Sequence, residues 1–344
     1  MGLEQRRALI QEIERKRESR VICCLTSDRP NANGLIAKDF IPIFYDHLNS
    51  FPDAKNVDVF LFTLGGDTLA SFGLSRLIRE FAKRIGLLVP DKCHSGGTLF
   101  ALGADQIFMS KMATLSPIDP SISGPLNPVV EVAPGVRQPL PVSVESVAGF
   151  KALVKQDWEL NDEAIGAAFK LLADKVNPLL LGDVYRSRQQ IAKLAEKLLL
   201  NHRKNDQQIE KIIGKLTKDL GSHDYLISKS EARSILGARV VQEDPDLDKL
   251  IMALYKDFTT EMELGKAYDP AIALHAAKAT GAKLPVPTTQ KIVMIESTSS
   301  CDVWERELLV SSIQAMTPMG PQESIRQDII KNGWKRYNIA EVAP

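Results

Sequence analysis

Three apolar runs separated by helix-like patterns dominate residues 57–122. The runs are Val57–Leu64, Ile85–Pro90 and Asp105–Ser110. Between the first two runs, apolar residues recur at positions i, i+3, i+4 and i+7, which is one face of a helix: Leu74, Leu77, Ile78 and Phe81. The order strand, helix, strand, helix, strand predicts an α/β protein with a parallel sheet and right-handed crossovers.

Two glycine-containing turns follow the first two of these strands. Gly65-Gly66 ends the first apolar run, and His94-Ser95-Gly96-Gly97 precedes the second helix. Ligands of parallel sheets bind outside the carboxyl ends of the strands, so we expect the two turns to share one crevice. Glycine can adopt backbone conformations that leave N–H groups pointing toward a ligand.

Ser95 is the candidate nucleophile at this crevice. It stands at a strand-to-helix turn, where its hydroxyl would lie at a helix N-terminus that favours developing negative charge. A serine facing free N–H groups has the minimum equipment for acyl transfer, a nucleophile and an oxyanion hole. Serine is also a preferred helix cap, so the spacing alone leaves a purely structural role open.

Three segments around these turns carry a resemblance to a known family. They are LGGD at 64–67, HSGGTLFALGADQIFM at 94–109 and LSPIDPSI at 115–122. They resemble the Clp/crotonase superfamily, and within it the serine dehydrogenase proteinase (SDH) family, which is related to signal-peptide peptidase A. The segments at 222–241 and, more loosely, 177–199 resemble the same family, so the resemblance covers residues 21–241. It implies a Clp/crotonase-like superhelix of ββα units, with Ser95 as nucleophile and the N–H groups of Gly66 and Gly96 as oxyanion hole.

The sequence does not identify a single residue that would accept the proton of the Ser95 hydroxyl. Where Clp-type peptidases carry their histidine, this chain has Pro120. Signal-peptide-peptidase relatives use a lysine on a later helix, and the first lysine after position 111 is Lys151, which would need burial to lower its pKa. His223 is the other main candidate, because the adjacent Asp224 could orient its imidazole. Lys175 is a third.

The rest of the chain divides around this core. We expect an N-terminal helix at 1–20, a catalytic core at 21–242 and a C-terminal appendage at 243–344. The proline-rich stretch 123–142 predicts a loop or short hairpin, with either a substrate-binding role or none. Residues 144–218 are mostly helical, and their long apolar stripe must pack in cis or on another subunit, which favours a homo-oligomer.

Two further groups of predictions concern the N-terminal part of the core and the C-terminal appendage. The first strand of the chain is predicted at Val21–Thr26, and in the loop after it Asp28 and Arg29 are candidate substrate contacts. In the appendage, the patterns indicate a helix near 247–265, a linker at 284–289, a strand at 291–296 and a helix at 299–314.

Composition limits the function further. The 43 basic and 43 acidic residues cancel, which gives no support for a nucleic-acid or anionic-lipid surface. The longest apolar runs are too short to span a bilayer, and the charged N-terminus is not a signal peptide, so we expect a cytoplasmic protein. The 4 cysteines show no CxxC pair or zinc spacing, and we expect Cys93 to be a buried, inert thiol.

The sequence thus favours a serine peptidase acting on peptides or proteins, without a cofactor or metal. It contains no Walker-type phosphate loop, so any dependence on ATP would come from a partner. Two alternatives stay open: a catalytically inactive Clp-fold scaffold that binds peptides or assembles with partners, and a crotonase-like coenzyme A thioester enzyme. The latter would use the same glycine N–H groups without a serine nucleophile.

Overall fold

The computed structural model describes residues 3–338 except 119–120, 123, 134, 141, 159, 203–204, 221, 223, 239, 282 and 318–319. The chain forms two compact units. The core unit comprises Met1–Thr114 and Ser228–Pro344, and the helical unit comprises Leu115–Ile227. The short strands β6 (Thr114–Leu115) and β11 (Ile227–Ser228) lie where the chain passes from one unit to the other.

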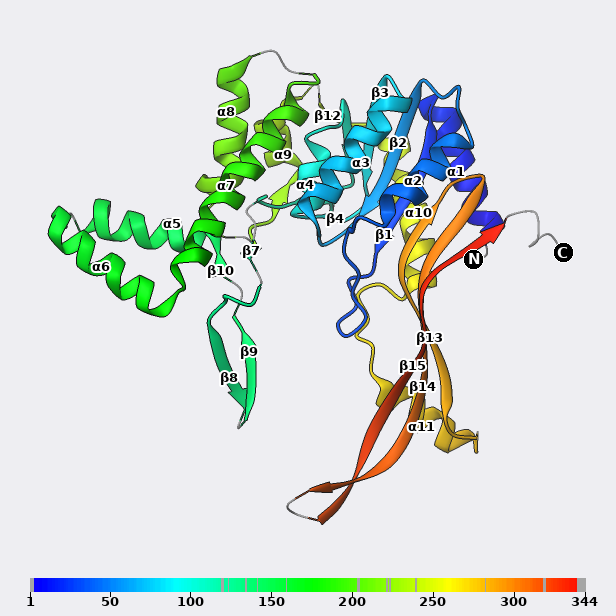
Figure 1. Cartoon of the computed structure of the whole chain (residues 1–344). Helices are drawn as coiled ribbons and strands as arrows, with labels where there is room; N and C mark the ends of the chain where they lie inside the picture. The colour runs from blue at the N-terminus through cyan, green and yellow to red at the C-terminus, as the bar shows by residue number, and fades with distance from the viewer. Residues whose placement is uncertain are drawn as a thin grey trace. The chain divides into compact units, whose positions relative to one another are not determined.

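The core unit is built on an eight-stranded sheet in the order β12-β5-β3-β2-β1-β13-β14-β15 (Figure 1). Its strands are β1 (Arg20–Thr26), β2 (Asn56–Phe62), β3 (Arg84–Val89), β5 (Gln106–Met109), β12 (Val241–Gln242), β13 (Val286–Glu296), β14 (Ser300–Thr317) and β15 (Gly320–Asn338). The pairings from β12 to β1 are parallel, and those from β1 to β15 are antiparallel. The predicted α/β class with a parallel sheet is confirmed.

Helices cover both faces of the parallel part of the sheet (Figure 1). They are α1 (Leu3–Arg17), α2 (Phe40–Asn49), α3 (Thr68–Phe81), α4 (Gly96–Ala101), α9 (Lys229–Leu236) and α10 (Pro245–Met262). A further helix, α11 (Pro270–Thr280), packs on the antiparallel strands β13, β14 and β15. On one face, Ile10 and Ile13 of α1 and Phe258 of α10 pack against alternate residues of β1 and β2. Each such large apolar side chain contributes about 1.5–3 kcal/mol when it is fully removed from water. This burial holds the strand ends, and so the turns that follow them, in fixed positions.

The C-terminal strands differ from the prediction. Residues 299–314 were expected to form a helix, and this is wrong, because β14 pairs along its length with both β13 and β15. Cys301, Val303, Leu308 and Val310 of β14 are buried, so packing and the two ladders outweigh the helix propensity of the intervening Glu, Arg and Leu residues. The linker expected at 284–289 is replaced from Val286 onward by β13.

The helical unit consists mainly of helices and two small antiparallel sheets of two strands each. Its helices are α5 (Val144–Ala152), the π-helical turn η1 (Leu153–Asp157), α6 (Asp162–Lys175), α7 (Pro178–Leu199), α8 (Asp206–Gly214) and the π-helical turn η2 (Lys215–Asp219). Its strands pair as β7 (Ser121–Ile122) with β10 (Val142–Ser143) and β8 (Val129–Ala133) with β9 (Val136–Pro139). The hairpin expected in the proline-rich stretch is present as β8–β9. Among the helices that the structure describes in either unit, none has the length and apolar character needed to cross a membrane.

Candidate active site

Gly65 and Gly66 form the first wall of the candidate site, at the carboxyl end of β2. Both have positive φ angles, 116° and 143°, which L-residues with a side chain rarely adopt. The Thr63 hydroxyl lies 3.0 Å from the Gly65 amide nitrogen, whose N–H it accepts. Ile36 then pairs with the turn, because its N–H donates to the Gly65 carbonyl and its carbonyl accepts from the Asp67 N–H, each at 2.8 Å.

This pairing fixes which way the Gly66 peptide group points. In the ladder between Ile36 and the turn, the N–H of Gly66 is the group left over, and it donates no hydrogen bond to any residue that the structure describes. The fit is close, since a Cβ atom on Gly66 would lie 2.2 Å from the Ile36 carbonyl oxygen. The turn therefore needs glycine at this position.

Ser95 stands on the second wall, between β4 (Lys92–Cys93) and α4. The strand end is fastened to β2, because Thr63 donates its N–H to the Lys92 carbonyl at 2.8 Å and accepts the His94 N–H at 3.0 Å. Ser95 itself has φ 49° and ψ −110°, a conformation that glycine tolerates and that costs other residues about 1–3 kcal/mol. Its side chain makes no cap hydrogen bond to the helix, which argues against the purely structural capping role.

The two walls meet at Ser95. A Cβ atom on Gly96 would lie 3.3 Å from the Gly66 amide nitrogen, so the Gly96 α-carbon and the Gly66 N–H are direct neighbours. Like Gly66, Gly96 donates no backbone hydrogen bond within the described part of the chain, whereas the next N–H, of Gly97, is used by the His94 carbonyl. The structure thus brings Ser95, Gly66 and Gly96 together, with two N–H groups beside the serine.

The surroundings of Ser95 are polar at the rim and apolar beneath. His94 contacts the Thr114 hydroxyl through Nε2 at 2.9 Å, and Thr98 donates its hydroxyl proton to the Cys93 carbonyl at 2.9 Å. Cys93 is completely buried, and this burial raises the pKa of its thiol, as expected for an inert cysteine. Ile36 and Thr63, which shape the turn, were not identified from the sequence, because neither carries a chemical signature that marks this role.

The two candidate substrate contacts after β1 are engaged within the core unit. Asp28 forms an ion pair with Lys92, with 2.6 Å between Oδ2 and Nζ, and accepts the Gly265 N–H at 2.7 Å. Arg29 pairs with Glu263 at 2.6 Å and donates to the Lys266 carbonyl at 2.9 Å. Both side chains fasten the segment after α10 to the loop after β1.

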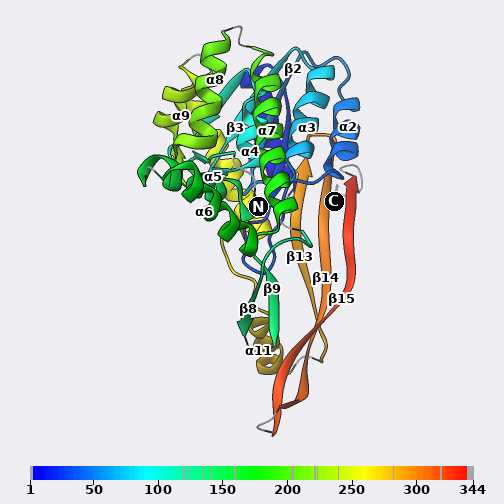
Figure 2. The same ribbon diagram turned by 60° about the vertical axis from the view of Figure 1, so that its left-hand side comes forward.

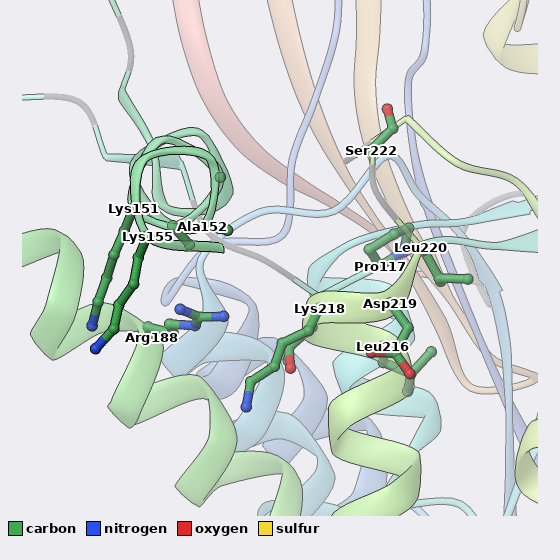
Figure 3. Close-up of a pocket in the computed structure, with 13 residues that line it drawn as sticks. Pro117, Lys151, Ala152, Lys155, Arg188, Leu216, Lys218, Asp219, Leu220 and Ser222 are labelled. Atoms are coloured by element: carbon green, nitrogen blue, oxygen red, sulfur yellow. The ribbon is translucent and has the colours of Figure 1, made fainter. Parts of the chain in front are cut away.

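The candidate bases are found elsewhere. Lys151, on α5, lies in the helical unit at a cavity of about 670 Å³ whose rim also carries Lys155, Arg188 and Lys218 (Figure 3). Its side chain is exposed, whereas the lysine of a serine–lysine dyad has to be buried. Lys175, the last residue of α6, is also exposed. His223 lies outside the described residues.

The comparisons with known proteins confirm the resemblance inferred from the sequence. The family model of ClpP-like SDH-type serine proteinases matches residues 1–137, which include both glycine turns and Ser95. The family match supports a serine peptidase in general.

Two curated relatives come from Methanocaldococcus jannaschii, and both are described as uncharacterized. The chain is 26% identical to MJ1495 over 254 residues, covering 72% of this chain and 75% of the relative. It is likewise 26% identical to MJ0137 over 256 residues, covering 72% and 77%.

Similar solved structures include proteases. An alanine mutant of the 1510-N membrane-bound stomatin-specific protease is 14% identical, with a TM-score of 0.37, and the match covers 62% of this chain and 78% of that protein. ClpP1 from Listeria monocytogenes is 13% identical, with a TM-score of 0.36, and the match covers 68% and 96%.

Proposed function

We propose that this protein is a serine peptidase in which Ser95 attacks the scissile carbonyl and the N–H groups of Gly66 and Gly96 bind the resulting oxyanion. One observation carries the proposal. Ser95 is held at φ 49° without a capping hydrogen bond, beside two backbone N–H groups that donate to no described residue. Backbone strain at a serine costs free energy, and a serine that only caps a helix gains nothing from it. A serine beside two N–H groups that have no described acceptor is suited to acyl transfer.

The reaction that this geometry supports has two halves. A base removes the Ser95 hydroxyl proton as Oγ bonds to the carbonyl carbon, and the carbonyl oxygen takes up negative charge between the two N–H groups. The tetrahedral intermediate collapses, and the leaving amine departs with the proton from the base. Water then attacks the acyl-enzyme by the same route and releases the carboxylic acid and the free serine. Removing one oxyanion donor typically costs about 10²–10³ in kcat.

The proposed reaction also needs a base that accepts the proton of the Ser95 hydroxyl. The candidates for this base are still Lys151, His223 and Lys175, because a neutral amine or imidazole can accept the hydroxyl proton. Lys151 and Lys175 are exposed, so a catalytic role for either would require further covering in the active form. A homo-oligomer acting in the cytoplasm on peptide or protein substrates is the form that we propose for the active protein.

A serine-directed fluorophosphonate probe tests the proposal. We expect labelling of the wild-type chain at Ser95, located by mass spectrometry of the labelled peptide, and none of Ser95→Ala. The variants Lys151→Ala, Lys175→Ala and His223→Ala then identify the base, because its loss should abolish labelling while leaving the fold intact. Lys155→Ala is the matched control for Lys151, since it lies on the rim of the same cavity and is equally exposed.

Absence of labelling in a folded, assembled wild-type protein would contradict the peptidase proposal. It would favour the inactive scaffold, which binding of peptides without turnover would support. Turnover of an acyl-coenzyme A thioester that survives Ser95→Ala would instead favour the crotonase-like alternative, because that chemistry needs the N–H groups and not the hydroxyl.

A further inference from the structure

The strand β15 has one half that is anchored to the core unit. Near its C-terminal end, the Trp334 indole donates to Asp39 at 2.8 Å and packs edge-on against Phe40 at 5.7 Å between ring centroids. Arg336 donates to Asp46 at 2.8 Å and to Asp302 at 2.8 Å. These contacts hold residues 333–338 against α2 and β14.

The other half of β15 is a free sheet edge. β15 ends the strand order of its sheet, so no strand that the structure describes pairs with its outer side. Along 322–332 nearly all side chains are exposed, including Ile325 at 40% and Ile329 at 60%. Figures 1 and 2 show the β14–β15 ribbon continuing well past the shorter strands of its sheet. A long edge with apolar side chains is a template for pairing with another strand.

The sequence of this free edge is complementary to itself in one antiparallel register. We propose that two copies of this chain pair along β15 about a twofold axis at Gln327. In this register Ile325 faces Ile329 of the second copy, and Arg326 faces Asp328 of the second copy. Opposed side chains of an antiparallel pair lie on the same face, so the isoleucines gather on one face and the charges on the other. The ladder then ends at Ile330, the residue of β15 left unpaired where the β14 register shifts.

The neighbouring registers are disfavoured by charge. Alternate residues of an edge strand point their N–H and C=O groups outward, so a strand can pair with its own copy only in registers that differ by two residues. The nearest shifts centre on Arg326 or on Asp328, and each sets two like charges directly opposite one another. Like charges directly opposed in a sheet are destabilising. Within one chain Arg326 and Asp328 already form an ion pair at 2.9 Å, which is exposed to solvent, so the dimer joins two such pairs into a four-charge cluster.

A cysteine at the proposed axis tests the register directly. The 4 native cysteines are all buried, so Gln327→Cys adds the one accessible thiol among the described residues. Opposed residues in an antiparallel pair have Cα atoms about 4.5–5.5 Å apart, within the range of a disulfide. We expect mild oxidation of the full-length protein to give a disulfide-linked dimer. Gln322→Cys is the matched control, since in this register the two copies of residue 322 lie about 34 Å apart.

Equal cross-linking of the two cysteine variants, or none at either position, would overturn the proposal. A second test separates the contact between copies from the ion pair within a chain. In the Gln327→Cys background, Arg326→Asp and Asp328→Arg each set like charges across the axis, and we expect several-fold less dimer from each alone. A mixture of the two should restore cross-linking as a mixed dimer, because every opposed pair is then of opposite charge.

The outcome of the mixing experiment does not depend on the activity of Ser95. An ion pair needed only within one chain cannot be restored by a second chain. Recovery in the mixture therefore supports pairing between copies. Loss that persists in the mixture, with both variants folded, contradicts it.

Discussion

Gly65 and Ser95 lie in direct contact: a Cβ atom added to Gly65 would come within 2.8 Å of the Ser95 Cβ atom. The two residues belong to turns at the ends of different strands, β2 and β4. Their closeness follows from the bridge between Thr63 and Cys93, which sets the two strand ends side by side. The candidate nucleophile is thus positioned by a neighbouring turn that has no room for a side chain.

We predict that Gly66→Ala destabilises the protein by several kcal/mol. The new Cβ would lie 2.2 Å from the Ile36 carbonyl oxygen, and φ of 143° is strained for alanine. Steric overlap with backbone costs about 1–3 kcal/mol or more, because neither side can move without breaking hydrogen bonds. Urea unfolding measures the change in the free energy of unfolding.

Gly182→Ala is the matched control for this substitution. Gly182 lies within α7, and its added Cβ would meet nothing within 4 Å. Alanine is favoured over glycine in a helix interior, so this variant should be about 0.5–1 kcal/mol more stable than wild type. Equal effects of the two substitutions would show that the turn around Gly66 is not as tightly packed as the structure indicates.

The backbone of Ser95 leads to a second prediction. Because φ of 49° with ψ of −110° is strained for every residue except glycine, Ser95→Gly should be more stable than Ser95→Ala by about 1–2 kcal/mol. Both variants lack the hydroxyl and should be inactive. Thermal unfolding of the pair gives the difference in stability, and a glycine variant no more stable than the alanine variant would argue against backbone strain at Ser95.

Much of the core fold was predictable because its pattern is local. The helix at 68–81 and the strands of the parallel sheet follow from apolar spacing and glycine turns, and β1, β2 and β3 appear close to their predicted bounds. The strand β14 was not predictable in this way, because its conformation depends on pairing with β13 and β15. Long-range pairing leaves little trace in a short sequence window.

The site was predictable to a similar extent. The turn at Gly65 and the turn at Ser95 were expected to share a crevice, and they lie in contact. The role of Ile36, which orients the Gly66 peptide through two backbone hydrogen bonds, could not be inferred, since backbone donors and acceptors are the same for every residue type except proline. The candidate bases stay predictions, because a base is defined by its distance from Ser95 and not by its residue type.

The cysteines give a third prediction. All 4 are buried, and burial raises the pKa of Cys24 and Cys93, so that at pH 8 their thiols stay protonated and unreactive. Ellman's reagent should therefore titrate no thiol in the native protein and all 4 in urea. Alkylating agents should leave fluorophosphonate labelling unchanged. Rapid reaction of Cys93 in the native state would place a reactive thiol beside Ser95 and would contradict the assignment of serine as the nucleophile.

The cluster of His47, Asp302 and Arg336 gives a prediction for the effect of pH on stability. Burial alone would raise the pKa of Asp302, but hydrogen bonds from His47 at 3.1 Å and Arg336 at 2.8 Å outweigh it and lower that pKa. A carboxyl with a lowered pKa stabilises the fold above its unfolded-state pKa of about 3.9 and loses this contribution as the pH falls through the folded-state pKa. Asp302→Asn should thus cost about 1–3 kcal/mol at pH 7, from weaker hydrogen bonds and the loss of the negative charge that Arg336 faces.

Urea unfolding of wild type and Asp302→Asn between pH 7 and pH 3 checks the direction of this pH dependence of stability. The difference in the free energy of unfolding between the two proteins should be constant above about pH 5. It should narrow below about pH 4, because protonated aspartic acid and asparagine are both neutral there. Asp183→Asn is the control, since Asp183 pairs with Arg186 on an exposed face of α7, where a pair contributes about 0–1 kcal/mol. A difference that widens toward acid would mean that the Asp302 carboxyl is held in its neutral form, which is opposite to the lowered pKa that the hydrogen bonds from His47 and Arg336 produce.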